Sequence, residues 1–252
     1  MFSVPRPRNL LLSSLSYADS ALLRPMTKVD LALNTSIELA DTAFDFVYFM
    51  ESGLASVVED VTALGAAEVG VIGFEGMSGI AIIFGDTQSS FDTYMQCEGT
   101  ALRIETMQLR MALHASPTLQ ARMLLYARAF TIQVATTAFA NARASLVERL
   151  ARWLLMIGDR VGDNLQITHE YLSTMLAVQR TGVTEALQTL ERQGIIRNTR
   201  GKIQIVDRAR LIHASSGSYG QAESEYKRLL FREDQSLSIS GRPLDHAERR
   251  NA

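Results

Sequence analysis

The stretch ITHEYLSTMLAVQRTGVTEALQTLERQGIIRNTRGKIQI, residues 167–205, contains two helix patterns, a short turn and two β-rich runs. Residues 167–176 predict a short helix with Thr168 as its N-cap, and residues 177–179 predict a tight turn. Residues 180–192 predict a second helix, because apolar side chains recur from Val183 at i, i+3, i+4 and i+7. Gly194 suits the position just past its end. The opposite face of this second helix is polar.

The two β-rich runs, residues 194–198 and 202–206, are joined through residues 199–201 and predict a hairpin. Helix, turn, helix and hairpin together form a winged helix-turn-helix. Two helices and a flap that only pack on each other would give the same helix pattern. The cations of the hairpin favour DNA binding, because contact with a phosphate backbone requires them. The residues predicted to contact DNA phosphates are Thr168, Gln179, Thr184, Arg197, Arg200 and Lys202.

Charge is distributed unevenly over the 252 residues, although the net charge is only −2. Residues 1–142 hold 8 Lys or Arg against 14 Asp or Glu, whereas residues 143–213 hold 11 against 7. This split indicates a polyanionic partner for the second part of the chain. The single cysteine, Cys97, excludes a disulfide within the chain and any zinc or iron–sulfur site built from several cysteines. No apolar run is long enough for a signal peptide or a membrane span, so we expect a cytoplasmic protein.

The N-terminal part of the chain shows a period of two. Residues 1–9 predict a loose arm, and residues 16–23 a short helix that begins at Ser16 and ends before Pro25. Short glycine-punctuated runs then predict an antiparallel β-barrel or roll. The predicted strands are residues 29–33, 44–48, 54–58, 68–72, 80–84, 91–97 and 100–104.

Residues 71–79 pack three glycines into nine residues. Glycine permits tight turns and close approach of a ligand to the backbone, and Glu75 could accept a hydrogen bond. The spacing is not the dinucleotide-binding GxGxxG pattern. Either a ligand site or a glycine corner required by the barrel would explain the segment.

Ser116 and Pro117 predict the start of a long helix, with serine as N-cap and proline at the first helical position. Apolar and small residues follow at alternating spacings of four and three, as in a two-stranded coiled coil. The predicted dimer seam is Leu119, Met123, Tyr126, Phe130 and Thr137. A monomer could instead pack this stripe on its own barrel. Hydroxyl groups near the stripe could set the register or reach a ligand, so the candidate effector pocket is Gly73, Glu75, Gly76, Thr136 and Thr137.

Residues 145–148, Ser-Leu-Val-Glu, form a capping box, which predicts a new helix and a hinge near residues 141–145. The chain is therefore expected to divide into a β-roll with its N-terminal arm (1–115), a dimerisation helix and hinge (116–144), a winged helix-turn-helix (145–213) and a C-terminal helix with a tail (214–252). The composition of the last twenty or so residues predicts disorder. The expected fold class is α+β.

An acidic β-roll, a long seam helix, a hinge and a C-terminal winged helix-turn-helix together resemble the Crp/Fnr family, regulators related to the cyclic-AMP receptor protein. The most specific segments are residues 147–155, 167–172 and 178–187. Residues 73–79 are similar to a Gly-x-Glu-Gly-Met-x-Gly segment of one branch of that family. The resemblance implies a cyclic-nucleotide-binding-like jelly roll and a homodimer that binds DNA and RNA polymerase. It also implies that Arg180, Thr181 and Glu185 read bases.

The sequence departs from the family where cyclic nucleotides bind. Those relatives hold the cyclic phosphate with an Arg-Ser/Thr-Ala segment, whereas residues 86–91, Asp-Thr-Gln-Ser-Ser-Phe, contain no cation. Cyclic AMP is therefore not expected, because a buried phosphate needs an ion-pairing group. Haem and an iron–sulfur cluster are not expected either, since one cysteine is present and the predicted roll contains no histidine. Cys97 is expected to be a buried core thiol.

Three functions compete at this point. The first is a homodimeric DNA-binding regulator of transcription whose roll senses a signal, and the second is a constitutive DNA-binding dimer whose roll is purely structural. The third is a cupin-like enzyme, which would need histidines and carboxylates on the strands to hold a metal. The missing histidines predict that the protein is not an enzyme. The effector, the operator sequence and the direction of regulation cannot be derived from the sequence.

Overall fold

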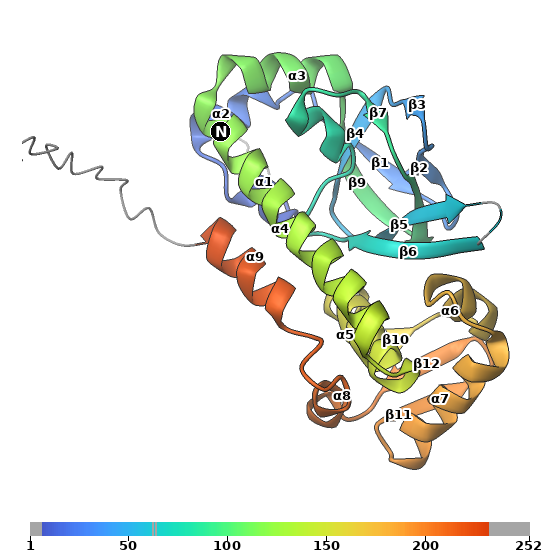
Figure 1. Cartoon of the computed structure of the whole chain (residues 1–252). Helices are drawn as coiled ribbons and strands as arrows, with labels where there is room; N and C mark the ends of the chain where they lie inside the picture. Colours follow the sequence, from blue (N-terminus) through green and yellow to red (C-terminus); the bar gives the residue numbers. More distant parts are fainter. Residues whose placement is uncertain (1–6, 62, 64, 232–252) are drawn as a thin grey trace, which may run out of the picture.

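The structure is a computed structural model, and it describes residues 7–61, 63 and 65–231. It confirms the expected α+β fold, with a β-roll at one end, a long helix along it and a helix-turn-helix domain with a wing at the other end (Figure 1). The strands of the roll are β1 (Thr27–Leu31), β2 (Ser36–Glu38), β3 (Thr42–Ala43), β4 (Phe46–Met50), β5 (Leu54–Val61), β6 (Gly65–Ile72), β7 (Gln88–Ser89), β8 (Asp92–Cys97) and β9 (Gly99–Glu105).

The roll consists of antiparallel sheets that enclose an apolar core. One sheet has the order β1-β9-β4, another has the order β2-β8-β5-β6, and β3 pairs with β7. The helices that cover the roll are α1 (Leu10–Ser13), α2 (Tyr17–Leu22), the 3₁₀ helix η1 (Ile80–Phe84) and α3 (Thr106–Ala115). Phe49 and Met95 are fully buried between these layers. The expected roll is thus present, and α3 closes the end that the sequence left unassigned.

The predicted strand at residues 80–84 is wrong, because this segment is the 3₁₀ helix η1. Gly79 and Gly85 flank it, both in the left-handed region with φ of +67° and +91°, and they turn the chain out of the sheet. A Cβ on Gly79 would lie 2.8 Å from Val47 Cγ2, so the backbone approaches β4 closely. A short apolar run without alternation cannot distinguish a buried strand from a helix.

The predicted loose arm is wrong at its end, because Asn9 is fully buried. Its side-chain amide donates to the carbonyl oxygens of Met50 at 2.9 Å and Gly76 at 2.8 Å, and Asn9 Oδ1 caps α1 by accepting from Leu12 N. These long-range partners could not be seen in the local sequence. Residues 1–6 of the predicted arm and the tail predicted to be disordered lie outside the described part of the chain.

The long helix α4 (Pro117–Arg143) begins as predicted, since Ser116 Oγ accepts from Leu119 N and Pro117 occupies the first turn. The predicted dimer seam is wrong, because its residues are buried within a single chain. Leu119, Met123 and Tyr126 are 0, 0 and 3% exposed within a single chain. The other two members of that seam, Phe130 and Thr137, are also partly buried against the rest of the chain. The apolar stripe therefore packs on the chain's own roll. Alternating spacings of three and four predict that one face of a helix is buried, but they do not identify the partner that buries it.

The Tyr126 hydroxyl donates to Met77 O at 2.9 Å and accepts from Met77 N at 3.0 Å. Phe130 lies against β6, where a Cβ on Gly70 would come within 2.8 Å of its ring. Gln133 Oε1 accepts from Val71 N at 2.7 Å. Helix α4 thus supplies polar and aromatic partners to β6 and to the glycine-rich segment that follows it.

The helix-turn-helix domain follows the predicted break between helices. Ser145 and Glu148 form the capping box that begins α5 (Leu146–Val161). The domain continues with β10 (Asn164–Leu165), α6 (His169–Met175), α7 (Arg180–Arg192), β11 (Ile196–Thr199), β12 (Lys202–Ile205) and α8 (Arg208–Ala214). The predicted N-cap Thr168 accepts from Tyr171 N, and Gly194 follows α7 with φ of +68°. The strand β10 was not predicted, and it adds a third strand to the wing.

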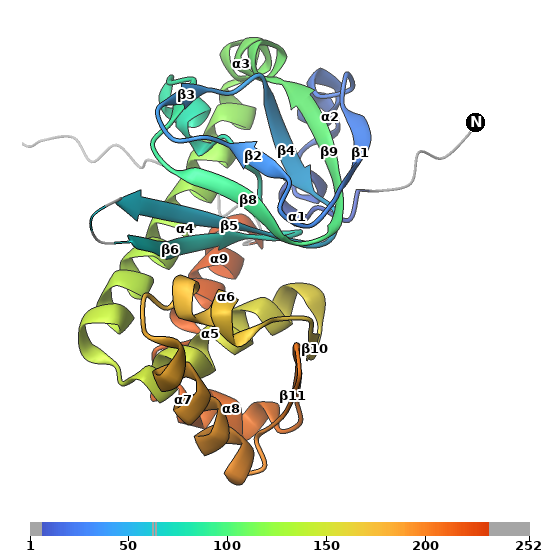
Figure 2. The same ribbon diagram turned by 90° about the vertical axis from the view of Figure 1, so that its right-hand side faces the viewer.

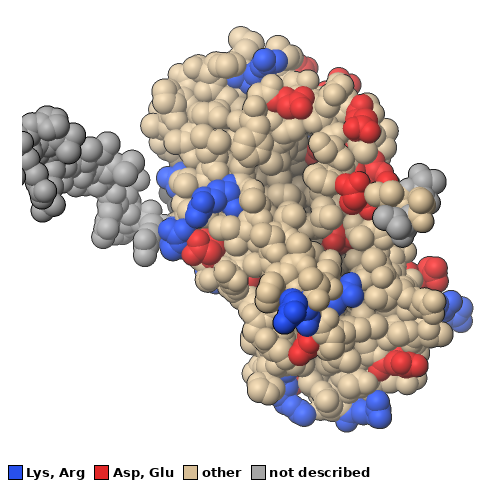
Figure 3. All heavy atoms as spheres, viewed as in Figure 1, with Lys and Arg blue, Asp and Glu red and all other residues tan. Residues whose placement is uncertain are grey.

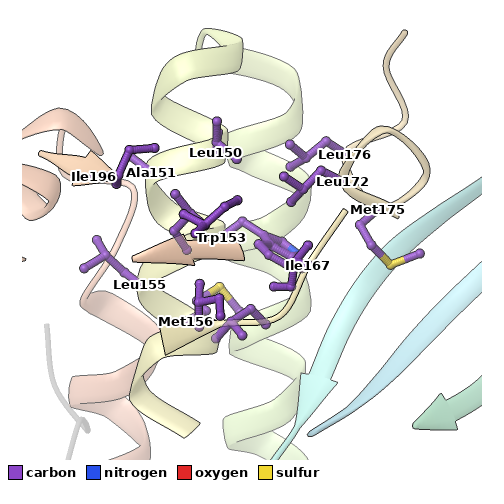
Figure 4. Packing of buried hydrophobic residues seen from close by; sticks show 14 of the residues in the cluster. Leu150, Ala151, Trp153, Leu155, Met156, Ile167, Leu172, Met175, Leu176 and Ile196 are labelled. Atoms are coloured by element: carbon purple, nitrogen blue, oxygen red, sulfur yellow. The ribbon is translucent and has the colours of Figure 1, made fainter. Parts of the chain in front are cut away.

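The core of this domain is built on α5, whose buried side chains pack with those of α6, α7 and the wing. Figure 4 shows α5 with Leu172 of α6 on one side and Ile196 of the wing on the other. Leu150 and Trp153 of α5 pack with Leu172 of α6 and with Ile196 of β11. The same cluster includes Leu54, Val58 and Val71 of the roll, so the two domains share one continuous core. Figure 2 shows β5 and β6 of the roll facing the helix-turn-helix domain. Helix α5 therefore supports the helix-turn-helix and also packs on the roll.

The last described helix, α9 (Gln221–Phe231), returns from the helix-turn-helix domain and lies beside α4 (Figure 1). Arg122 Nη1 on α4 donates to Leu230 O at 3.1 Å, and the Tyr226 hydroxyl donates to Glu75 O. Near its start, Arg152 Nε donates to Ser218 O at 3.0 Å. This segment therefore bridges the roll, α4 and α5.

Candidate nucleic-acid interface

The second helix of the motif, α7, buries one face and exposes the other. Val183, Ala186, Leu187 and Leu190 are at most 3% exposed. Arg180, Thr181 and Glu185, for which the family resemblance implies base reading, are all exposed. The Arg180 guanidinium lies 3.9 Å from the Glu170 carboxylate of α6, but both side chains are about 70% exposed or more. Such an exposed pair is weak, so Arg180 can exchange Glu170 for another acceptor.

The residues predicted to contact phosphates differ in their exposure and in the contacts that they make within the protein. Gln179, directly before α7, is exposed, as are Arg197, Arg200 and Lys202 on the wing. Thr168 is also exposed, but its hydroxyl caps α6. Thr184 is partly buried, and its hydroxyl donates to Arg180 O at 3.0 Å and lies 3.1 Å from His169 Nδ1. Thr184 therefore holds the two helices together within the protein.

His169 and Asn198 were missed by sequence reasoning. The His169 ring lies between Thr184 of α7 and Asn198 of the wing, with Nε2 3.3 Å from Asn198 Nδ2. The backbone N–H of Asn198 in turn donates to Glu191 Oε1 at 2.8 Å. These contacts fix the wing relative to α7. No signal in the sequence paired residues 29 positions apart.

Charge on the surface follows the division seen in the sequence. On the face shown in Figure 3, acidic side chains are frequent along the right-hand side of the roll, whereas Lys and Arg side chains lie at the lower end, near α7, and at the left, near α9. The wing cations are Arg197, Arg200 and Lys202. An exposed polar helix beside a cationic hairpin is the arrangement that enters a major groove while it holds the flanking phosphates.

The candidate effector pocket predicted from the sequence is wrong, because Thr136 and Thr137 do not share a cavity with Glu75. Glu75 lines a cavity of about 440 Å³ between β6, α4, α5 and α9. Thr136 and Thr137 accept instead from Arg152 Nη2, at 3.2 and 3.1 Å, and neither lines that cavity. The glycines serve close packing, since a Cβ on Gly76 would lie 2.4 Å from the Tyr126 hydroxyl. The register of α4 on the roll, which the sequence does not give, separates these groups.

Glu75 forms a buried ion pair with Arg160 of α5. Arg160 Nη2 lies 2.6 Å from Glu75 Oε1, and the two side chains are 7 and 14% exposed. Burial alone would lower the pKa of Arg160, but the carboxylate of Glu75 raises that pKa above its ordinary value. The pair links the glycine-rich segment of the roll to the helix-turn-helix domain.

A second cavity, of about 400 Å³, lies inside the roll against α4. It is lined by the segment around Asp86 and Ser89 and by Glu38, and burial raises the pKa of Glu38 above its usual range. Neither Lys nor Arg is among the described residues that line it. This lining is unsuited to a phosphate, because nothing in it would offset the phosphate's charge.

Other candidate chemistries have little support in the described part of the chain. Cys97 is partly rather than fully buried, and burial together with Glu68 raises the pKa of its thiol to about 11, which disfavours the reactive thiolate. Among the described residues, no group of three or more His, Cys, Asp or Glu side chains could hold a metal ion. Of the helices described, none has the length and apolar character required to cross a membrane.

Comparison with known proteins supports both the fold of the chain and the assignment of its helix-turn-helix domain. Residues 148–214 match the Crp-like helix-turn-helix domain family. The chain is similar in structure to a candidate transcriptional regulator of the Crp/Fnr family from Eubacterium rectale, with a TM-score of 0.66 and 19% identity over 82% of this chain and 98% of that one. FixK2 from Bradyrhizobium japonicum gives a TM-score of 0.65 and 14% identity over 75% of this chain and 96% of that one.

A transcriptional regulator of the CRP family from Thermus thermophilus gives a TM-score of 0.63 and 19% identity over 77% of this chain and 99% of that one. A comparison with curated protein sequences gave no match. The solved structures establish the fold, and the domain match identifies residues 148–214 as a Crp-like helix-turn-helix domain.

Proposed function

We propose that this chain is a transcription regulator of the Crp/Fnr family that binds a palindromic operator as a homodimer. The observation that carries the proposal is the exposed polar face of α7 beside a cationic wing, within the residues that match the Crp-like domain. Such a regulator works in the cytoplasm and acts on RNA polymerase, and it has no catalytic residues. We retain the division into residues 1–115, 116–144, 145–213 and 214–252 as part of this proposal.

The face of α4 that points away from the chain supports a dimer contact. This exposed face, and not the buried stripe predicted from the sequence, is the proposed dimer contact. Its members share exposure and alternate at spacings of three and four, as in a two-stranded coiled coil. They are Ala121, Leu124, Arg128, Thr131, Ala135, Ala138 and Ala142. Two copies joined along this face would hold two α7 helices side by side, about one DNA turn or ~34 Å apart.

Base recognition follows from the chemistry of three side chains on α7. Arg180 can donate two hydrogen bonds to a guanine, and Glu185 can accept from the amino group of a cytosine. Thr181 lies beside them on the exposed surface. Gln179, Arg197, Arg200 and Lys202 would hold the phosphates on either side, which sets the position of α7 but not its sequence preference.

Arg180→Ala tests the proposal directly. Loss of one bidentate contact costs about 1–3 kcal/mol, so the affinity for a selected operator should fall roughly 5- to 140-fold, whereas binding to random DNA should change little. Fluorescence anisotropy with labelled duplexes measures both. Arg210→Ala is the matched control, because Arg210 is an exposed arginine on α8 outside the motif. Equal losses for the two variants would mean that Arg180 contributes only charge.

Two forms of this function differ in the role of the roll. The cavity lined by Glu38, Asp86 and Ser89 could admit an uncharged or cationic ligand that gates DNA binding. The roll could also be purely structural, with control exerted through the abundance of the protein. Titration of the protein with candidate effectors while operator affinity is measured separates the two forms.

A further inference from the structure

The contact between the roll and the helix-turn-helix domain is centred on Glu68 of β6, whose side chain is buried. Trp153 Nε1 of α5 donates to Glu68 Oε1 at 2.8 Å. Glu68 Oε2 lies 2.6 Å from Ser56 Oγ of β5, and that hydroxyl lies 3.1 Å from the hydroxyl of Tyr171 on α6. A single carboxyl group therefore connects two strands of the roll with two helices of the other domain.

Too few protons are available around Ser56 to satisfy every close contact when Glu68 is ionised. Ser56 Oγ also lies 2.7 Å from Gln96 Oε1, and a hydroxyl donates only one proton. If Ser56 donates to Gln96, the contact with Glu68 requires a proton on the Glu68 carboxyl. If Ser56 donates to Glu68, the Gln96 amide must turn so that Nε2, which has no partner here, faces Ser56. The two arrangements correspond to two protonation states of Glu68.

The surroundings of Glu68 disfavour its charge. Burial raises the pKa of Glu68 to about 7, although the hydrogen bonds from Ser56 and Trp153 act in the opposite direction. Tyr94 and Cys97 of β8 and Tyr171 of α6 also face Glu68. The negative charge of Glu68 raises the pKa of each of these three groups.

Two cations of α5 act on Glu68 only from a distance. Arg152 is held by the hydroxyls of Thr136 and Thr137 and by Ser218 O, and Arg160 is paired with Glu75. Within the described part of the chain, neither cation forms an ion pair with Glu68. The carboxyl therefore lacks the partner that would keep it ionised in a buried site.

We infer that Glu68 is a proton-operated latch, which docks the helix-turn-helix domain on the roll when protonated and so fixes the orientation of α7. Its effect on DNA rests on the proposed function. In the docked arrangement the polar face of α7 is exposed, so docking and DNA contact are compatible. The latch therefore makes operator binding depend on pH.

The sign of this dependence follows from linkage. In the docked arrangement Glu68 has a pKa of about 7, whereas an undocked, hydrated Glu68 would return to its ordinary value of 4.5. Between these values the docked form binds more protons than the undocked form. The docking equilibrium should therefore weaken by up to about tenfold per pH unit as the pH rises to 7, and then level off.

Trp153 reports on this latch directly, because it is the only tryptophan in the chain and its indole donates to Glu68. Tryptophan emission of the full-length protein, followed from about pH 5.5 to about pH 8.5, should change sigmoidally with a midpoint near 7. Glu68→Gln, which keeps the shape but cannot ionise, should abolish this transition. Glu59→Gln is the matched control, since Glu59 is an exposed carboxylate on β5. A flat wild-type curve, or an unchanged transition in Glu68→Gln, would overturn the inference.

DNA binding supplies the second measurement and separates this inference from the proposed function. Wild-type affinity for a selected operator, at constant ionic strength, should fall as the pH rises from about 5.5 to 7. The Glu68→Gln protein should keep the low-pH affinity throughout. Equal pH dependence in both proteins, or tighter wild-type binding at higher pH, would overturn the regulatory role of the latch. If no DNA is bound at any pH, the proposed function fails while the tryptophan titration still decides the latch.

Discussion

Single residues in this protein are held by partners that lie far away in sequence. Tyr126 is the clearest case, because its spacing suggested a contact between subunits, whereas its hydroxyl satisfies both backbone groups of Met77. The helix caps at Ser116, Ser145 and Thr168 could be predicted, since each depends on a residue three positions away. A partner 49 positions away leaves no such local signal.

Tyr126→Phe tests this assignment at the level of one hydroxyl. The substitution leaves a buried N–H and a buried carbonyl of Met77 without a partner, which should lower the free energy of unfolding by about 1–3 kcal/mol. Urea denaturation measures the change, and the oligomeric state should stay the same. Tyr17→Phe, at an 82% exposed position, is the control and should have little effect. An intact stability together with a weakened dimer would restore Tyr126 to the subunit interface.

At the scale of elements, helices could be predicted more reliably than the edges of the roll. Long helices carry caps and a 3.6-residue period, and α4, α5 and α7 were found from these signals. The strands β2, β3, β7 and β10 have only two or three residues each, too few for a period. The residues 80–84 were assigned to a strand because the role of the two glycines in the left-handed region was missed.

Leu124→Glu tests the exposed face of α4 as the dimer contact. Leu124 is 43% exposed in a single chain, and in the proposed coiled coil it would be buried with its counterpart. Two unpaired carboxylates at that position should raise the dimer dissociation constant by roughly a hundredfold or more. Sedimentation equilibrium measures this constant. Leu33→Glu, at an exposed leucine of the roll, should leave the dimer intact, and equal dissociation by both variants would argue against this face.

At the scale of the whole molecule, three polar links join the roll to the helix-turn-helix domain, in addition to the apolar core that the two domains share. They are the Glu68 network, the Glu75–Arg160 ion pair and the segment that leads into α9. The sequence predicted both domains and the break between α4 and α5, because composition and caps are local. It did not predict how the domains touch, since that depends on the register of α4 and on contacts such as the hydrogen bond from Trp153 to Glu68.

The dependence on long-range contacts also explains why one candidate site could be predicted from the sequence and the other could not. The side chains proposed to contact DNA lie on or next to one exposed helix and one hairpin, so their grouping follows from sequence order. The predicted effector pocket combined residues of a roll segment and of a distant helix, and the structure separates Glu75 from Thr136 and Thr137. A site assembled from distant segments requires the tertiary structure.

The central claim is that a homodimer reads a two-fold symmetric DNA site through α7, and selection from random duplex DNA tests it most directly. Purified full-length protein, without added ligand, should enrich a palindrome whose half-sites are centred about 10 base pairs apart, matching ~34 Å. Arg180→Ala should fail to enrich that palindrome. The account would be contradicted by an enriched site without two-fold symmetry, or by the same site emerging from Arg180→Ala.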